Sequence, residues 1–234
     1  MKVLLTFSKG EGVRWLGHLD LMRAFERAIR RSGIGAAHSE GFNPRIRLAF
    51  ASALGLGVTG GEEPALLELS GEAPAEDVHR RLAEKLPQGI RLLSVRIVAP
   101  DEARGLLQTY RLADLELRLT AGDYTVHDVN QACARLLERP SVEVVRMKER
   151  ARKTVDIRPF IRALVAHAED REIIVYATTH IGGDGGVRPS EIAEALAQAI
   201  PGLELRRAHR IRVRPSEPDY EATDLLSAGK EVKQ

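Results

Sequence analysis

Cysteine is almost absent from this sequence, with Cys133 alone among 234 residues. A single thiol cannot form an intramolecular disulfide, and it cannot supply the cysteines of a zinc or iron–sulfur site within the chain. Cys133 and four histidines, His38, His79, His127 and His167, also show no spacing typical of a metal site. We therefore expect no metal and no cofactor, and we expect Cys133 to lie on the apolar side of a helix in the core.

Long hydrophobic runs are missing as well. The sequence contains no stretch of eighteen apolar residues, so it predicts no membrane-spanning helix and no membrane partner. The N-terminal stretch MKVLLTFSKG has too short an apolar core for a secretory signal, and no small-residue cleavage site follows it. With 44% hydrophobic and 29% charged residues, the composition is typical of a globular protein, which we expect to be cytoplasmic.

A large excess of charge of one sign is also lacking, since the formal net charge is only +2. The calculated pI is nevertheless about 8.8, and most of the positive charge is arginine. Arginine presents planar, permanently charged donors that suit phosphate groups. The overall charge is weak evidence for nucleic-acid binding, so local clusters of arginine are the better guide.

The order of the predicted elements indicates an α+β protein that repeats one theme. Each half is predicted to contain two helices and at least four strands in a βαββαβ order. We therefore predict two tandem ferredoxin-like halves with antiparallel sheets and helices on one face. Their predicted bounds are residues 1–100 and 109–215, joined by a linker over Pro100–Gln108 and followed by a flexible polar tail, residues 216–234.

Individual elements follow from apolar periodicity and from end signals. A helix is predicted over Leu19–Arg31, where an apolar stripe recurs and Gly33 follows as a stop. A strand is predicted over Arg45–Leu54, and a helix capped by Thr125 precedes Pro140. Two apolar strands are predicted to form a hairpin around residues 169–171.

The stretch EGFNPRIRLAF is an unusual entry to a strand. Pro44 fixes its own φ and pushes Asn43 toward extended geometry, and alternation then places Arg45 and Arg47 on one face of the strand. One interpretation is a rigid loop that presents Phe42 for base stacking and two guanidinium groups to a polyanion. The alternative is that Phe42 fills the core and the arginines are solvated.

His18 is the one candidate for acid–base chemistry, because it lies at or just before the start of a predicted helix. The helix N-terminus lowers the pKa of a neutral histidine there, which suits a general base in a metal-independent endoribonuclease. Asp20 could instead cap the helix while His18 packs. No second catalytic group is identifiable from the sequence.

The stretch IGGDGGVRPSE places four glycines before a predicted helix. Such a loop exposes backbone N–H groups that can hold an anion, so Gly183, Gly185 and Arg188 are candidate anion-binding residues. The stretch matches neither the phosphate-binding P-loop nor the dinucleotide-binding fingerprint. A flexible connection between a strand and a helix is the alternative.

The last predicted strand, LELRRAHRIRVRP, carries the densest positive charge. One face holds several arginines that repel one another unless an anion lies against them. This predicts a binding surface, and an exposed edge strand protected by charge is the alternative. The arginines on this face are Arg206, Arg210, Arg212 and Arg214.

A shorter basic stretch, RKTVDIRPFIR, surrounds a proline. Lys153 and Arg158 are candidate anion-binding residues. Asp156 and Arg158 are expected either to form an ion pair with each other or to orient a ligand.

Four stretches together resemble a radical-SAM-linked family of unknown function: SKGEGVRWLGHLDLMRAFERAIRRSGI, HSEGFNPRIRLAFASALGLGV, KTVDIRPFI and GVRPSEI. The resemblance runs from Lys2 to about Arg214. Members of this family occur alone or fused behind a cobalamin-binding-type radical SAM protein. The family pattern leads us to expect His-Pro after the first proline of the loop, where this sequence has Arg45 and Ile46, and this departure favours a charged binding loop over a catalytic histidine.

The resemblance implies an accessory role, because radical SAM chemistry needs three closely spaced cysteines and this chain has one. We interpret the chain as a non-catalytic module that binds RNA or presents a substrate to a radical SAM enzyme. The alternatives are a protein adaptor that docks on such an enzyme, and the endoribonuclease, which would be similar in outline to the CRISPR repeat-RNA endonucleases.

Overall fold

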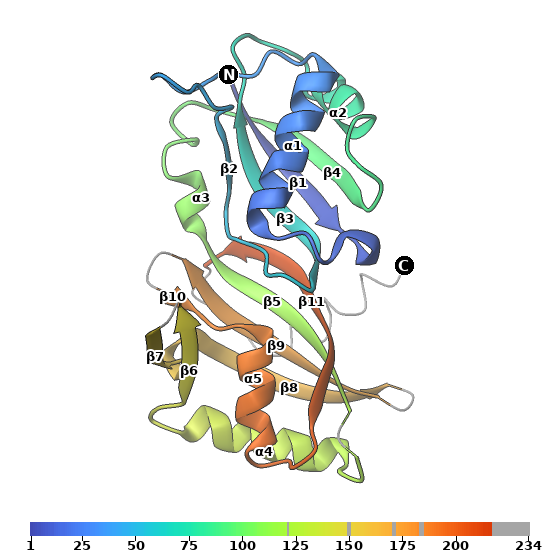
Figure 1. The fold of residues 1–234 in the computed structure, drawn as a ribbon, viewed down its shortest axis with the longest axis vertical. Coiled ribbons are helices and arrows are strands. Elements are labelled where there is room, and N and C mark those ends of the chain that lie inside the picture. The colour runs from blue at the N-terminus through green and yellow to red at the C-terminus, as the bar shows by residue number, and fades with distance from the viewer. Residues whose placement is uncertain (121, 149–150, 170–171, 183–184, 217–234) are drawn as a thin grey trace. The chain divides into compact units, whose positions relative to one another are not determined.

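A computed structural model describes the chain except for residues 121, 149–150, 170–171, 183–184 and 217–234. The turn of the predicted hairpin and nearly all of the predicted tail therefore lie outside the described residues. The chain divides into two compact units, Met1–Tyr110 and Arg111–Gln234. Each unit combines helices with a sheet of mostly antiparallel strands, which confirms the predicted α+β class (Figure 1).

Unit 1 is a four-stranded sheet with helices inserted between its strands. The strand order is β4-β1-β3-β2, and all three neighbouring pairs are antiparallel. The elements of unit 1 are β1 (Lys2–Lys9), η1 (Glu11–Val13), α1 (His18–Ser32), β2 (Leu48–Phe50), β3 (Val58–Glu68), α2 (Ala75–Ala83), β4 (Ile90–Val98) and α3 (Leu106–Thr109).

Alternation along β1 gives the sheet of unit 1 two buried faces. Phe7 lies on the face covered by α1, where its ring meets the ring of Phe25 edge-on with centroids 4.7 Å apart. Leu4 lies on the opposite face and packs with Ala103 and with apolar residues of α3. Part of the predicted linker is therefore packed into unit 1 and ends in a short helix.

Unit 2 has a sheet in which β9 is paired with β8 and β10, then with β5, which neighbours β11. Strands β6 and β7 form a separate antiparallel ribbon. The elements are β5 (Tyr110–Thr120), α4 (Val126–Glu138), β6 (Glu143–Lys148), β7 (Ala151–Asp156), η2 (Arg158–Phe160), β8 (Ile161–Glu169), β9 (Glu172–Gly182), β10 (Gly185–Gly186), α5 (Pro189–Ala197) and β11 (Glu204–Pro215).

The start of α4 follows the predicted cap. The Thr125 side chain accepts a hydrogen bond from the Asp128 N–H, and the Asp128 carboxylate accepts one from the Thr125 N–H, which forms a capping box. The helix then buries one apolar stripe that includes Cys133, which is 1% exposed. The predicted core position of Cys133 is confirmed.

Burial should make Cys133 unreactive in the folded protein. Desolvation raises the pKa of the Cys133 thiol to about 12, so almost no thiolate forms at ordinary pH. We expect the folded chain to show no reaction with Ellman's reagent in mildly alkaline buffer, and one equivalent to react after unfolding in urea. Rapid reaction of the folded protein would show that the helix opens or is packed differently.

One predicted strand is shorter in the structure, and one strand of the structure was not predicted. The predicted strand over Arg45–Leu54 is reduced to β2, because the chain leaves the sheet after Phe50 and enters a loop that turns at Gly57, where φ is +77°. Strand β7 was not predicted, because most of its side chains are polar and exposed and it lacks the apolar alternation of a half-buried strand.

Candidate nucleic-acid interface

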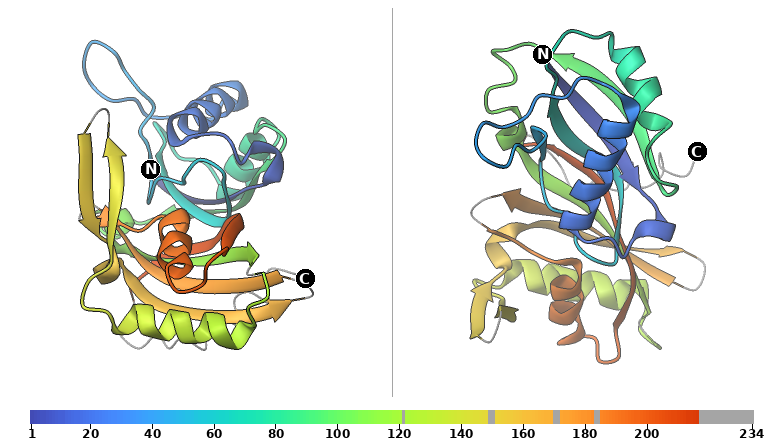
Figure 2. Two further views of the ribbon diagram at one scale, coloured as in Figure 1. Left: turned by 60° about the horizontal axis from the view of Figure 1, so that its bottom comes forward. Right: turned by 45° about the horizontal axis from the view of Figure 1, so that its top comes forward.

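The connection between α1 and β2 forms a projecting loop, which we call the Phe42 loop and define as residues 38–47. Its two arms are tied together at the base by a bridge between His38 and Ile46. The Ser39 N–H donates to the Arg45 carbonyl at 2.8 Å, and the Arg45 N–H donates to the Ser39 hydroxyl at 3.0 Å. The loop extends away from the sheet and helices of unit 1 (Figure 2). These bonds fix the base of the loop while its tip stays in solvent.

Phe42 lies at the tip of this loop and is 101% exposed relative to its reference state. The alternative in which Phe42 fills the core is therefore wrong. Gly41 precedes it with φ +115°, a conformation that side chains other than glycine rarely adopt, so Gly41 sets the direction of the tip. Asn43 follows at the tip and Arg45 lies where the loop returns to its base, and both side chains are exposed. The loop therefore presents a ring, an amide and a guanidinium group together.

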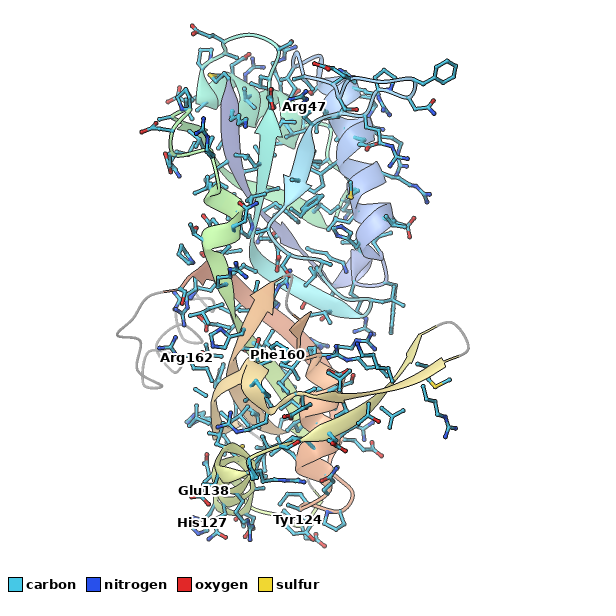
Figure 3. The ribbon with its side chains drawn as sticks, turned by 90° about the vertical axis from the view of Figure 1, so that its left-hand side faces the viewer. Arg47, Tyr124, His127, Glu138, Phe160 and Arg162 are labelled. Atoms are coloured by element: carbon cyan, nitrogen blue, oxygen red, sulfur yellow. The ribbon has the colours of Figure 1, made fainter. Side chains whose placement is uncertain are left out.

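Arg47 lies at the base of the Phe42 loop (Figure 3). Its Nε donates to the His38 carbonyl at 3.2 Å, and its Nη1 lies 3.5 Å from a Glu68 carboxylate oxygen. Ile46 and Leu48 point to the core, so the predicted alternation of arginine and apolar residues is confirmed. Arg47 therefore braces the loop while keeping part of its guanidinium group exposed.

His18 begins α1 and is packed rather than paired. Its ring meets the ring of Phe50 edge-on, with centroids 5.7 Å apart. Its Nδ1 is buried and has no hydrogen-bond partner among the described residues. No described carboxylate or guanidinium group is bonded to the His18 ring, so the geometry supplies no second group for the predicted acid–base role.

The glycine-rich stretch is built around an aromatic ring. Gly183 lies outside the described residues. Gly185 has φ +134°, and a Cβ there would lie 2.5 Å from the ring of Phe160 (labelled in Figure 3). The need for glycine at this position is thus explained by Phe160, without a bound anion.

The N-terminus of α5 already carries a carboxylate. Glu191 is 5% exposed, and it accepts a hydrogen bond from the Arg188 N–H at 2.8 Å. Arg146 of β6 donates to both oxygens of Glu191, at 2.7 and 2.8 Å. Burial opposes ionisation, but these bonds outweigh it and hold the pKa of Glu191 below its ordinary value. The Glu191 carboxylate thus lies at the N-terminus of α5, where the sequence predicts a bound external anion.

The arginine face of β11 has its own anionic partner. Asp114 of β5 is fully buried, and the Nε atoms of Arg212 and Arg214 each donate to its Oδ2 at 2.9 Å. Arg210 is 5% exposed, so the alternative of an exposed, charge-protected edge is wrong for this residue. Arg206 lies at the exposed start of β11, 3.2 Å from Glu204. Asp114, which no local sequence pattern indicated, therefore explains how Arg212 and Arg214 lie together on this face.

Asp156 and Arg158 do not form the ion pair between side chains that was expected as one possibility. The Asp156 carboxylate accepts hydrogen bonds from the N–H groups of Val142 and Arg158, and these bonds lower its pKa. The Arg158 guanidinium donates to the carbonyls of Leu137 and Ile161, at 2.9 and 2.8 Å. Arg158 therefore ties the end of α4 to the start of β8.

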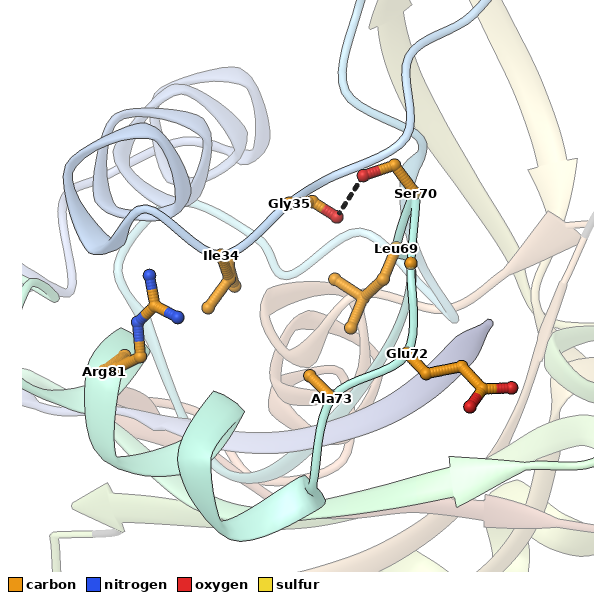
Figure 4. A pocket seen from close by; sticks show the side chains of 8 residues that line it. Ile34, Gly35, Leu69, Ser70, Glu72, Ala73 and Arg81 are labelled. Atoms are coloured by element: carbon orange, nitrogen blue, oxygen red, sulfur yellow. Dashed lines mark hydrogen bonds between the residues drawn. The ribbon is translucent and has the colours of Figure 1, made fainter.

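A pocket of about 180 Å³ opens in unit 1 beside the C-terminal end of α1 (Figure 4). On one side, the Ser70 hydroxyl donates to the Gly35 carbonyl at 3.0 Å. On the other, Arg81 donates from Nε to the Ser32 carbonyl at 3.0 Å. The pocket is smaller than typical small-molecule sites and contains none of the predicted site residues. Its lining residues are Ile34, Gly35, Leu69, Ser70, Gly71, Glu72, Ala73 and Arg81.

The structure thus places four predicted residues, Phe42, Asn43, Arg45 and Arg47, on one braced loop of unit 1. The described predicted residues of unit 2 are distributed over β7, η2, the end of the glycine-rich stretch and β11. Among the described residues, no group of three or more potential ligand side chains is placed for a metal ion. None of the described helices is both long and apolar enough to cross a membrane.

Chains in two crystal structures are similar to this chain in fold. A chain in a Cbf5–Nop10–Gar1 complex matches with TM-score 0.51 and 11% identity, covering 93% of this chain and 50% of that one. A chain in an archaeal box H/ACA sRNP Nop10–Cbf5 complex matches with TM-score 0.50 and 11% identity, covering 96% of this chain and 53% of that one. The present chain therefore spans about half the length of each.

A search of the curated proteins finds no match to this sequence. A family model does match, and it covers residues 2–189, which is most of the chain. The chain belongs to the family described as an uncharacterized protein conserved in bacteria (DUF2344).

Proposed function

We propose that this chain is an RNA-binding module that contacts single-stranded RNA through the Phe42 loop. The observation that carries the proposal is the fully exposed ring of Phe42 on a loop whose base is braced by backbone bonds. The ring leaves a flat aromatic face open to a partner at the tip of a loop with a fixed base. Bases stack on such rings, and the exposed Arg45 beside it suits a neighbouring phosphate.

The fold is a second argument for the proposed RNA binding. One of the matched structures is a component of an sRNP, which is an assembly of RNA and protein. In unit 1 the strand order is β4-β1-β3-β2 with helices after the first and third strands, and unit 2 shows the corresponding order β11-β5-β9-β8. We propose that residues 1–100 and 109–215 form two tandem ferredoxin-like halves, a scaffold that leaves loops free for ligands.

The biological setting proposed for this module follows the family resemblance. The chain is proposed to be non-catalytic and cytoplasmic, and to hold RNA or another substrate for a radical SAM enzyme that is encoded nearby or fused in relatives. Retention of a radical SAM protein by the immobilised chain tests this partner. Retention that vanishes after nuclease treatment would mean that RNA bridges the two proteins, and no retention would contradict the partnership.

A protein adaptor is a second candidate, because unit 1 also exposes apolar side chains away from the Phe42 loop. Trp15, Leu19 and Leu56 are each about two-thirds exposed, at 64%, 65% and 64%. Exposed tryptophan is typical of contact sites on partner proteins. Trp15→Ala should abolish retention of a partner protein and leave RNA affinity unchanged if the adaptor function holds.

Phe42→Ala is expected to weaken RNA binding by roughly 5- to 150-fold, since stacking of one base contributes about 1–3 kcal/mol. The probe is a short, mixed-sequence, fluorescein-labelled single-stranded RNA, followed by fluorescence anisotropy. Phe42→Trp should retain the affinity because it keeps an aromatic face. Because the side chain is fully exposed, neither variant should change the melting temperature. Equal affinity of Phe42→Ala and the unchanged chain would remove Phe42 from the interface.

A further inference from the structure

We infer that the β6–β7 ribbon of unit 2 is a second RNA contact, which binds bases through an apolar face and phosphates through its cations. The inference rests on the proposed RNA-binding function and extends it to a ribbon that contains the predicted anion-binding residue Lys153 and whose second strand was not predicted. The ribbon consists of six residues in each strand, paired antiparallel from Glu143 with Asp156 to Lys148 with Ala151.

One face of this ribbon, which we call the outer face, carries the exposed side chains of Glu143, at the base of the ribbon, and of Val145, Met147, Arg152 and Thr154. Val145 pairs with Thr154, and Met147 pairs with Arg152, so all four share one side of the ribbon. Val145 is 63% exposed and Met147 is 61% exposed. Arg152 and Thr154 are exposed as well. An apolar pair beside a cation and a hydroxyl is therefore presented to solvent.

The opposite face holds the ribbon to unit 2. Arg146 lies on this face and makes its two bonds to the buried Glu191 of α5. It also donates to the Gly186 carbonyl. Two-stranded ribbons are at best marginally stable in water by themselves, so this buried ion pair supplies anchorage that the ribbon needs.

The ribbon extends away from the sheet of unit 2 (Figure 3). Within the described residues, β6 and β7 pair only with each other. The ribbon projects, exposes Val145 and Met147, and is held in place by the Arg146–Glu191 ion pair. Its geometry therefore favours a binding arm.

The charges on the ribbon favour RNA as the occupant. Arg152 is exposed on the outer face, and Lys153, which pairs with Arg146, is exposed on the other. Two carboxylates, Glu143 and Asp156, lie opposite each other at the base of the ribbon, and the two cations lie farther along the strands. A polyanion can contact both cations, while Val145 and Met147 lie against bases. The apolar area is small for a stable protein interface.

The first test removes the two exposed cations with Arg152→Ala/Lys153→Ala and follows binding of the labelled RNA across a salt titration. Each lost phosphate contact on single strands should reduce the slope of log K against log salt by about 0.7, so a reduction of about 1.4 is expected. The matched control is Arg27→Ala/Arg135→Ala, which removes two exposed arginines from the helices α1 and α4. The control should lose no more than a small fraction of the slope.

The second test changes the apolar pair with Val145→Ser/Met147→Ser, which leaves the charge unchanged. Burial of these two aliphatic side chains against bases predicts a loss of affinity of roughly 5-fold or more at low salt, with the salt slope preserved. Both positions are exposed, and retention of the thermal unfolding midpoint checks that the ribbon variants fold.

The outcomes separate this inference from the proposed function. If the unchanged chain binds RNA, Phe42→Ala weakens binding and both ribbon variants behave like the arginine control, the ribbon inference is overturned and the Phe42 loop stands. If the unchanged chain does not bind RNA, both are overturned. Loss of a retained partner protein in Val145→Ser/Met147→Ser, with RNA affinity unchanged, would assign the ribbon to protein docking and would also overturn the inference.

Discussion

Asp114→Ala is expected to lower the free energy of unfolding of unit 2 by about 3–5 kcal/mol, the range for breaking a buried ion pair by removing one partner. Asp114 has no exposed surface, and its carboxylate accepts bonds from Arg212, Arg214 and the Thr178 hydroxyl. Without the carboxylate, two guanidinium groups lose the anion that offsets their charge and their removal from water.

Urea unfolding followed by far-ultraviolet circular dichroism measures this loss. Asp123→Ala is the matched control, because Asp123 is an exposed carboxylate in the same unit and its removal should change stability by less than about 0.5 kcal/mol. If Asp114→Ala unfolds at the same urea concentration as the control, the buried cluster does not hold the sheet of unit 2 together.

Lys9→Met is expected to destabilise unit 1 by a similar amount, about 3–5 kcal/mol. Lys9 is fully buried, and four backbone carbonyls lie within hydrogen-bonding distance of its ammonium group and share its three N–H donors. These belong to Arg14 (2.9 Å), Leu16 (2.8 Å), Gly55 (3.4 Å) and Val58 (3.1 Å). Methionine keeps most of the side-chain volume but donates nothing, so buried carbonyls that need donors are left without this one.

The loss of local stability in Lys9→Met should be largest in the two segments whose carbonyls face the ammonium group, residues 14–16 and 55–58. Hydrogen exchange followed by mass spectrometry should show faster exchange in both segments of Lys9→Met. Lys85→Met is the control, since the ammonium group of Lys85 lies at the surface near Glu84. Unchanged exchange and unchanged stability in Lys9→Met would show that the four carbonyls are satisfied without the ammonium group.

The sequence predicted the elements that follow a clear local rule. Strand β8 ends at Glu169 and β9 begins at Glu172, which agrees with the predicted hairpin. Helix α4 begins directly after the predicted Thr125 cap, because a cap is set by a few neighbouring residues. Gly33 ends α1 in the left-handed conformation, as the stop signal indicated. Local periodicity and capping therefore accounted for most helices and for the apolar strands.

The buried polar groups inside each unit were harder to predict, because their partners are distant in sequence. Asp114 meets Arg212 and Arg214 across 98 and 100 residues, and an aspartate in an alternating strand indicates an exposed side unless its partner is known. Lys9 ends a strand, where a lysine is ordinarily solvated. For the Phe42 loop, the sequence predicted a rigid, charged connection but left the position of the ring open.

Ultraviolet crosslinking of the chain to single-stranded RNA, followed by mass spectrometry of tryptic peptides, tests the RNA-binding role most directly. Crosslinks form at bases in direct contact with a ring, and Phe42 lies in the tryptic peptide Ser32–Arg45. We predict a nucleotide adduct on Phe42 in this peptide, and its loss in Phe42→Ala. Adducts confined to other peptides, or none under conditions in which RNA is bound, would contradict the assignment of the Phe42 loop as the RNA contact.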